Sequence, residues 1–288
     1  MKPRIRIRLF DRLSVLCGDR ELLVHSSANA KEILCYLIVN RRGSVTRDAL
    51  AALIAPSLPH AKSKKALRHA LWQLRVGLSL TRCECSPRLL SFGPGWAQFT
   101  PDEQVSVDTD DLERLSSSAK NLEDNTPIHP SALSKAVETY RGDFLQGWEQ
   151  HWCELERQRL RQIYLEVLDA LVGYCESHNH VGAGVGYATN ALGIDPAREG
   201  SHRSLMRLYA LTGDRTSALN QYRGCVEALR ELGLCPDADT NALEQQIRAG
   251  RTSDSTDQMG QPTESLGPEP RIARRARSRL RQPRETFE

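Results

Sequence analysis

The sequence predicts a mixed, two-domain fold in which an α+β domain is followed by an all-α domain. In the first part of the chain, short strand-like patterns stand on both sides of three helical patterns. After Val107 the apolar spacing stays helical as far as about Gly250, and helix-turn-helix units recur. We expect the two domains to span residues 1–102 and 106–250, with residues 251–288 forming a disordered, Arg-rich tail.

The strands of the first domain are predicted from alternation and turn residues. Residues 4–10 alternate basic and apolar side chains, which is typical of a half-buried strand. Gly18-Asp19 marks a turn, and a second short strand fits residues 22–24. Two further runs, 88–92 and 96–100, are separated by Gly93-Pro94-Gly95 and predict a hairpin.

Three helices are predicted between these strands. The first covers residues 30–40, and the second begins after the capping residue Thr46 and ends before Pro56. The third covers residues 62–78 and has one apolar stripe opposite a basic face. A sheet, three helices with a basic third helix, and a terminal hairpin are the element order of a winged helix-turn-helix domain, in which the hairpin is the wing.

The second domain reads as helical throughout. Apolar periodicity covers residues 112–122, 133–140 and 148–176, and two helix pairs follow, ending near Pro196 and Pro236. Helix pairs that recur in this way, with proline at the end of each unit, predict tetratricopeptide-like helices that stack to share a core.

The charge of the chain is divided between its two halves. Residues 1–100 carry 17 Lys and Arg against 6 Asp and Glu, a net charge of +11. Residues 101–250 carry 14 basic and 24 acidic side chains, a net charge of −10, although the whole chain has a net charge of only +3. A basic first domain favours a polyanionic partner such as DNA, because phosphate contacts are made by Lys and Arg. A merely solvated basic face is the alternative.

The sequence gives no support to a membrane, secreted or enzymatic protein. It has no run of eighteen uncharged apolar residues and no signal-peptide core, so we expect a cytoplasmic location without membrane contact. No nucleophile elbow and no glycine-rich phosphate loop occur, so we expect no enzyme activity and no cofactor.

The cysteines and histidines do not predict a metal site. Eight cysteines are spread along the chain, and several lie in apolar helical patterns, which favours reduced, buried thiols. Cys83-x-Cys85 and the cluster of Cys175, His178 and His180 lack the paired spacing of a structural zinc site, so no bound metal is expected.

Several segments resemble the SARP-like (antibiotic regulatory protein) regulators over roughly residues 5–250. Ala66 to Arg75 resembles the recognition helix of that family, and other landmarks follow in the family's order, at residues 47–50, 140–147, 154–160, 202–208 and 218–222. The chain departs from the family at Ile54–Pro59, which lacks a usual tryptophan, and at Gln73 and Val76, which replace two arginines. These departures concern the phosphate contacts and the DNA site, not the fold.

The resemblance implies a transcriptional activator that is not an enzyme and does not depend on a phosphorelay. Its first domain would be a winged helix-turn-helix of the OmpR/PhoB type, and its second the bacterial transcriptional activation domain. It also implies a homodimer on tandem repeats of promoter DNA and contact with RNA polymerase, with the loop from Ala55 to Ala61 as one contact. The modules by which some relatives sense nucleotides are missing from this sequence, so no nucleotide sensing is expected.

The DNA-binding residues are expected on the helix 62–78 and beside the wing. Arg68 is the first candidate for a base contact, followed by His69, Trp72 and Gln73, while Lys64 and Lys65 suit phosphates. Trp72 could instead pack against the wing, or press on a sugar or a thymine methyl group. Arg75, on the same helix, and Arg88, which flanks the wing as Arg82 does, complete the predicted set.

The main alternative is a helical-repeat scaffold that binds a protein, with a basic first domain that touches nucleic acid or an acidic partner without specificity. A scaffold would show little preference between promoter and random DNA. The placement of the positive charge on one helix, followed by a wing-like hairpin, favours the regulator.

Overall fold

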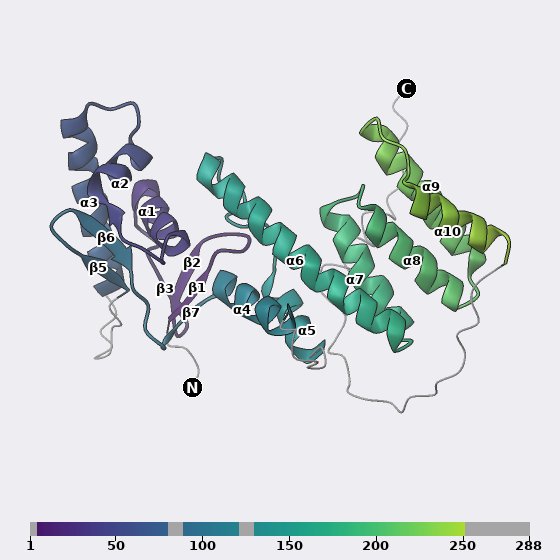
Figure 1. Cartoon of the computed structure of the whole chain (residues 1–288). Helices are drawn as coiled ribbons and strands as arrows, with labels where there is room; N and C mark the ends of the chain where they lie inside the picture. Colours follow the sequence, from purple (N-terminus) through teal and green to yellow (C-terminus); the bar gives the residue numbers. More distant parts are fainter. Residues whose placement is uncertain (1–4, 80–88, 121–129, 251–288) are drawn as a thin grey trace, which may run out of the picture. The chain divides into compact units, whose positions relative to one another are not determined.

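The computed structural model of the chain describes residues 5–79, 89–120 and 130–250, which form two compact units (Figure 1). The first unit comprises Met1–Asp111 together with Gly142–Leu160, and the second comprises Leu112–Arg141 together with Arg161–Glu288. The expected tail, residues 251–288, lies outside the described residues. The first unit is mixed α and β and the second is helical, so the predicted two-part, α+β and all-α organisation is confirmed.

A four-stranded sheet opens the first unit, in the order β3-β2-β1-β7. Strands β1 (Ile5–Arg8), β2 (Ser14–Cys17) and β3 (Arg20–Leu22) are antiparallel neighbours, and β7 (Val105–Val107) pairs in parallel with β1. The alternation of β1 buries Ile5 and Ile7 and leaves Arg6 exposed, as the sequence pattern predicts.

Two of these strands were not predicted, and one was misplaced. β2 was missed because only Val15 among its residues is buried, so it shows no clear alternation. β7 was missed because its partner β1 lies about a hundred residues earlier in the chain. The strand expected at 22–24 ends at Leu22, because Leu23 takes a left-handed conformation with φ of 60°.

Three helices and a three-stranded sheet complete the core of this unit. The helices are α1 (Ala28–Val39), α2 (Arg47–Ile54) and α3 (His60–Ser79), and the sheet has the order β4-β6-β5, from β4 (Val45–Thr46), β5 (Leu90–Phe92) and β6 (Trp96–Phe99). The Thr46 hydroxyl accepts from the Ala49 amide and caps α2, as predicted. α3 starts two residues earlier than predicted, because the Pro59 carbonyl accepts from the amides of Lys62 and Ser63.

The hairpin of β5 and β6 turns at Gly93, where the indole of Trp96 folds back onto the turn. A β-carbon at position 93 would collide with that indole, so glycine is needed here for the close approach. This packing fixes the tip of the hairpin. Trp96 therefore has a packing role at the turn of the hairpin.

Residues 142–150 belong to the first unit because they bond along the end of β1. The Leu145 amide donates to the Leu9 carbonyl at 2.8 Å, and Asp11 exchanges backbone hydrogen bonds with Asp143 and Gln146. The carboxylate of Asp108 accepts from the amides of Leu9 and Phe10 at 2.9–3.1 Å. The first unit therefore takes in more of the chain than residues 1–102.

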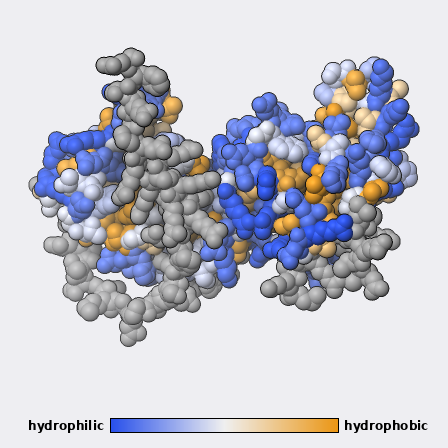
Figure 2. All heavy atoms as spheres, turned by 180° about the vertical axis from the view of Figure 1, so that it is seen from behind, coloured by the Kyte–Doolittle hydropathy of each residue, from blue (hydrophilic) through white to orange (hydrophobic). Residues whose placement is uncertain are grey.

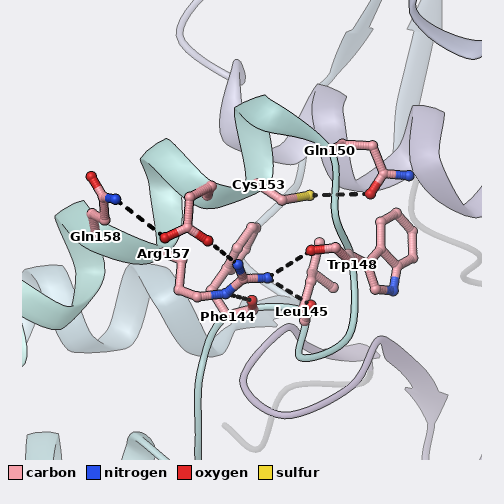
Figure 3. A network of polar contacts seen from close by, with 8 residues as sticks. Phe144, Leu145, Trp148, Gln150, Cys153, Arg157 and Gln158 are labelled. Atoms are coloured by element: carbon pink, nitrogen blue, oxygen red, sulfur yellow. Dashed lines mark hydrogen bonds and ion pairs between the residues drawn. The ribbon is translucent and has the colours of Figure 1, made fainter. Parts of the chain in front are cut away.

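Arg157 holds this segment in place (Figure 3). Its guanidinium, 11% exposed, donates to the carbonyl oxygens of Phe144, Leu145 and Trp148 at 3.0–3.1 Å and pairs with Glu154. Three carbonyls that no strand or helix uses thereby gain charged donors. The planar fork of arginine is what allows one side chain to serve them all.

The second unit is built from helices that follow one another along the chain (Figure 1). They are α4 (Asp108–Lys120), whose first four residues belong to the first unit, α5 (Pro130–Thr139), α6 (His151–Ser177), which contributes its residues from Arg161 onward, α7 (Val181–Ile194), α8 (Glu199–Leu211), α9 (Arg215–Glu231) and α10 (Ala238–Arg248). The turn between α6 and α7 is made at Asn179, with φ of 56°, while Gly182 lies inside α7.

Polar links join α8 of this unit to α6 and to α10. Arg203 of α8 donates to Asp237 at 2.7 Å and to Thr240 at 2.9 Å, and Arg198 pairs with Asp169 of α6. Asp237 also caps α10, because its carboxylate accepts from the Thr240 amide at 2.7 Å. The hydrogen bonds from Thr240, with Arg203 beside them, lower the pKa of Asp237 to about 2.

Four of the six described cysteines are buried and free, as the apolar patterns predicted. They are Cys35, Cys153, Cys175 and Cys225. Burial raises the pKa of the Cys153 thiol to about 12 and that of the Cys175 and Cys225 thiols to about 11, so these groups stay protonated and unreactive at neutral pH.

On the face that Figure 2 shows, hydrophilic residues predominate and hydrophobic areas lie between them. Among the helices of the described ranges, none combines the length and the apolar composition that crossing a bilayer requires.

We expect Arg157→Met to lower the free energy of unfolding of the full chain by about 2–4 kcal/mol, because the carbonyls of residues 144–148 and the Glu154 carboxylate lose their donor while methionine keeps the packing volume. Urea unfolding followed by circular dichroism measures this change.

The matched control is Arg159→Met, two residues further along α6, where the arginine is 46% exposed and pairs with Glu156. The Arg159 guanidinium is far more exposed than that of Arg157, although its partner Glu156 is only 11% exposed, so we expect a smaller loss. Equal losses in the two variants would contradict the role given to Arg157.

Candidate nucleic-acid interface

Helix α3 carries seven of the eight predicted DNA-binding residues. Its core face consists of Leu67, Ala70, Leu71 and Leu74, all buried, which recur at the 3.6-residue period and pack in the unit's core. The opposite face therefore points outward. It bears the seven residues at positions 64, 65, 68, 69, 72, 73 and 75, whereas Arg88 lies outside the described residues.

The basic side chains near the start of α3 are exposed. Lys65 and Arg68 make no ion pair with any residue in the described parts of the chain. Lys64 pairs with Asp48 of α2 at 3.1 Å, but both side chains are largely exposed, so the pair adds little stability and opens easily. All three can therefore reach an external anion.

Gln73 is bonded within the unit rather than pointing freely outward. Its side-chain oxygen accepts from the Ser27 amide at 3.1 Å and from the Ser27 hydroxyl at 2.5 Å. Ser27 is also the N-cap of α1, since its hydroxyl accepts from the Ala30 amide. One amide side chain thus ties α3 to the first turn of α1.

The side-chain amide of Gln73 also orients the imidazole of His69. The Gln73 oxygen is used as an acceptor, so its nitrogen is the donor in the 3.1 Å contact with Nε2 of His69. Nε2 must then be the acceptor, which assigns the neutral tautomer with the proton on Nδ1. His69 therefore keeps an N–H donor for an outside partner.

Trp72 lies on the outer face of α3 and not under the hairpin. Its side chain is 58% exposed and stacks on His69, with ring centroids 5.8 Å apart. The residue that α3 lays against the hairpin is Arg75, whose guanidinium lies 4.4 Å from the centre of the Phe92 ring of β5. The structure therefore does not place Trp72 against the hairpin, which was one of its two interpretations.

Sequence reasoning missed the residues that position this face. Ser27 and Phe92 are far from α3 in the chain, and no pattern links either of them to Gln73 or Arg75. Val76 is different, because it follows Trp72 by one helical turn and is 38% exposed. Its spacing could have identified it as part of the outer stripe.

We expect Gln73→Leu to lower the free energy of unfolding by about 1–2 kcal/mol, since Ser27 loses its acceptor, and to free His69 from its single tautomer. The 15N chemical shifts of the His69 imidazole should change from those of one tautomer to those of a mixture. His151, an exposed histidine of the same unit that does not line the groove beside Gln73, is the internal control and should not change. An unchanged His69 spectrum would contradict the assigned hydrogen bonds.

Comparison with known proteins gives two findings. A family model described as the bacterial transcriptional activator domain matches residues 107–248. The solved structure of Mycobacterium tuberculosis EmbR in complex with a low affinity phosphopeptide resembles the chain with a TM-score of 0.68 and 18% sequence identity, over 97% of this chain and 71% of that one. At this identity the second likeness concerns the fold. No curated protein sequence matches the chain.

The domain match lies where the sequence landmarks placed the helical domain, and its description agrees with the family that those landmarks resemble. Residues 107–248 of the chain therefore form a bacterial transcriptional activator domain, as in the SARP-like transcriptional regulators that the sequence resembles.

Proposed function

We propose that this protein binds promoter DNA at specific sequences through α3 and the β5–β6 hairpin, and activates transcription together with RNA polymerase. The observation that carries the proposal is the outward face of α3, where Lys65 and Arg68 are exposed and have no ion pair among the described residues. A helix with one buried face and one basic outward face suits the major groove.

The finer fold assignments belong to the same proposal. Residues 1–102 would be the winged helix-turn-helix domain of the OmpR/PhoB type, with α3 as recognition helix and the hairpin as wing. Residues 106–250 would be the tetratricopeptide-like domain. The short turns between α7, α8, α9 and α10, and the polar links that join α8 to α6 and to α10, support stacked helix pairs.

Each residue of the face has a role in this proposal. Arg68 contacts a base, and the Nδ1–H of His69 is a second donor to the groove. Lys64 and Lys65 contact phosphates, as does Arg88 beside the wing. Gln73 and Arg75 position the helix instead, because their side chains already bind Ser27 and lie on Phe92.

The helical domain would hold two protomers on tandem DNA repeats. Its negative net charge supports a role away from DNA, since residues 101–250 carry 24 acidic side chains against 14 basic ones. The alternative function is a protein-binding helical scaffold with a non-specific basic domain, and DNA selectivity separates the two.

We expect Arg68→Ala to reduce the preference for a duplex selected from a random pool over a scrambled duplex by about 5- to 150-fold, the effect of losing one good base contact. Lys65→Ala should weaken binding to both duplexes alike and reduce the slope of log Kd against log salt by about one. Fluorescence anisotropy across a salt series measures both.

The matched control is Arg12→Ala, which removes an exposed arginine of the same unit that lies between β1 and β2. It should leave selectivity unchanged. If the unaltered chain bound both duplexes equally and weakly, the regulator proposal would fail and the scaffold would be favoured.

The loop between α2 and α3 is the proposed polymerase contact. Leu58 lies in it with its side chain 48% exposed, between Pro56 and Pro59, and the pair of prolines limits the conformations of the loop. An apolar side chain held outward on a stiff loop supports a protein contact.

We expect Leu58→Asp to leave Kd for the selected duplex within about twofold and to abolish activation, because a carboxylate replaces the apolar contact with polymerase. In vitro transcription from a promoter with the selected site measures activation. Leu234→Asp, at a leucine 55% exposed in the second unit, is the control. Full activation by the Leu58 variant would exclude the loop as the contact with polymerase.

A further inference from the structure

The outward face of α3 changes character halfway along the helix. Lys62, Lys65 and Arg68 are exposed charged residues in its first part. Trp72 and Val76 follow at the spacing of one helical turn, 58% and 38% exposed, and they are the two large apolar side chains of α3 with this exposure among its described residues. An exposed apolar stripe on a basic helix costs hydration free energy unless a partner covers it.

A third apolar side chain lies beside this stripe. Val24, 55% exposed, shares with Trp72 and Val76 a groove of about 340 Å³, which residues 20–26 line on one side and Gln73 and Gly77 help to line on the other. Gly77 brings the two walls together, since a β-carbon there would lie 2.6 Å from a methyl group of Leu23. Glycine inside a helix costs about 1 kcal/mol relative to alanine, and here it permits this approach.

The indole of Trp72 is already ordered in the free protein by contacts with neighbouring side chains. It stacks on His69, His69 accepts from Gln73, and Gln73 is bound by Ser27 of another helix. A contact made by an ordered side chain loses less conformational entropy on binding.

Only one group on the major-groove edges of the bases is apolar, and it is the C5-methyl group of thymine. Resting on the proposed function, we infer that Trp72 reads a thymine methyl group in the DNA site, with Val76 and Val24 closing the apolar contact around it. Trp72 lies about 6 Å along the helix from Arg68, because each residue rises 1.5 Å. The thymine therefore lies within about two base steps of the base that Arg68 contacts.

The test uses a base that lacks only the methyl group. The full chain selects its site from a randomised duplex pool, and each thymine of that site is then replaced in turn by deoxyuridine. We expect one replacement to weaken binding of the unaltered protein about fourfold, the effect of one buried methyl group. The Trp72→Ala variant should bind the thymine and deoxyuridine duplexes equally, while it keeps the base preference set by Arg68.

Two further variants distinguish a loss of thymine-methyl recognition from a general loss of folded structure. Trp72→Phe keeps an aromatic ring and should keep part of the methyl discrimination, and Leu155→Ala, which removes an exposed leucine of the same unit outside the groove, should keep all of it. The inference is overturned if no deoxyuridine replacement weakens the unaltered protein. It is equally overturned if Trp72→Ala still discriminates, or loses affinity uniformly for all duplexes, as a sugar contact would require. If no sequence is enriched from the pool, the proposed function itself has failed.

Discussion

The first unit depends on how a non-helical, non-strand segment in the middle of the chain is held to its sheet. Residues 142–150 have backbone groups that need partners, and Arg157 supplies donors to three of their carbonyls from a largely buried position. The cost of removing a guanidinium from water is offset only when most of its donors find acceptors, which is the case here. With this segment fixed, the end of β1 has neighbours on both sides, from Asp108 and from Leu145.

On the outward face of α3, too, one residue makes several of the hydrogen bonds that fix the neighbouring side chains. Ser27 caps α1 and also binds Gln73, so the start of one helix and the outer face of another share a single hydroxyl and amide. Gln73 in turn bonds to His69, and Trp72 stacks on His69. The face therefore combines free charge, which attracts a polyanion from a distance, with an ordered aromatic group that acts only at contact.

The sequence predicted well what depends on local periodicity and less well what depends on distant partners. The apolar stripe of α3 and the alternation of β1 each contain their own signal within a few residues, and both elements form where expected. β7 has three residues and pairs with a strand about a hundred positions away, so no local pattern marks it. Gln73 was expected at a base edge because it lies on the outward face, but its side chain binds Ser27, 46 residues earlier, and only the fold brings them together. Arg157 likewise looks in sequence like one of several arginines in a helix.

The match to the bacterial transcriptional activator domain begins at Val107, and this residue is the last of β7, a strand in the sheet of the first unit. The boundary of the matched sequence family and the boundary between the two compact units are thus different in this molecule. Asp108 and Arg157, which stabilise the sheet end, both lie on the activator side of the family boundary. Recombination that joined a foreign activator domain at residue 107 would have to bring equivalents of both side chains with it. An activator domain can therefore replace this one only if it also carries residues equivalent to Asp108 and Arg157. We expect the two parts of the chain to evolve together.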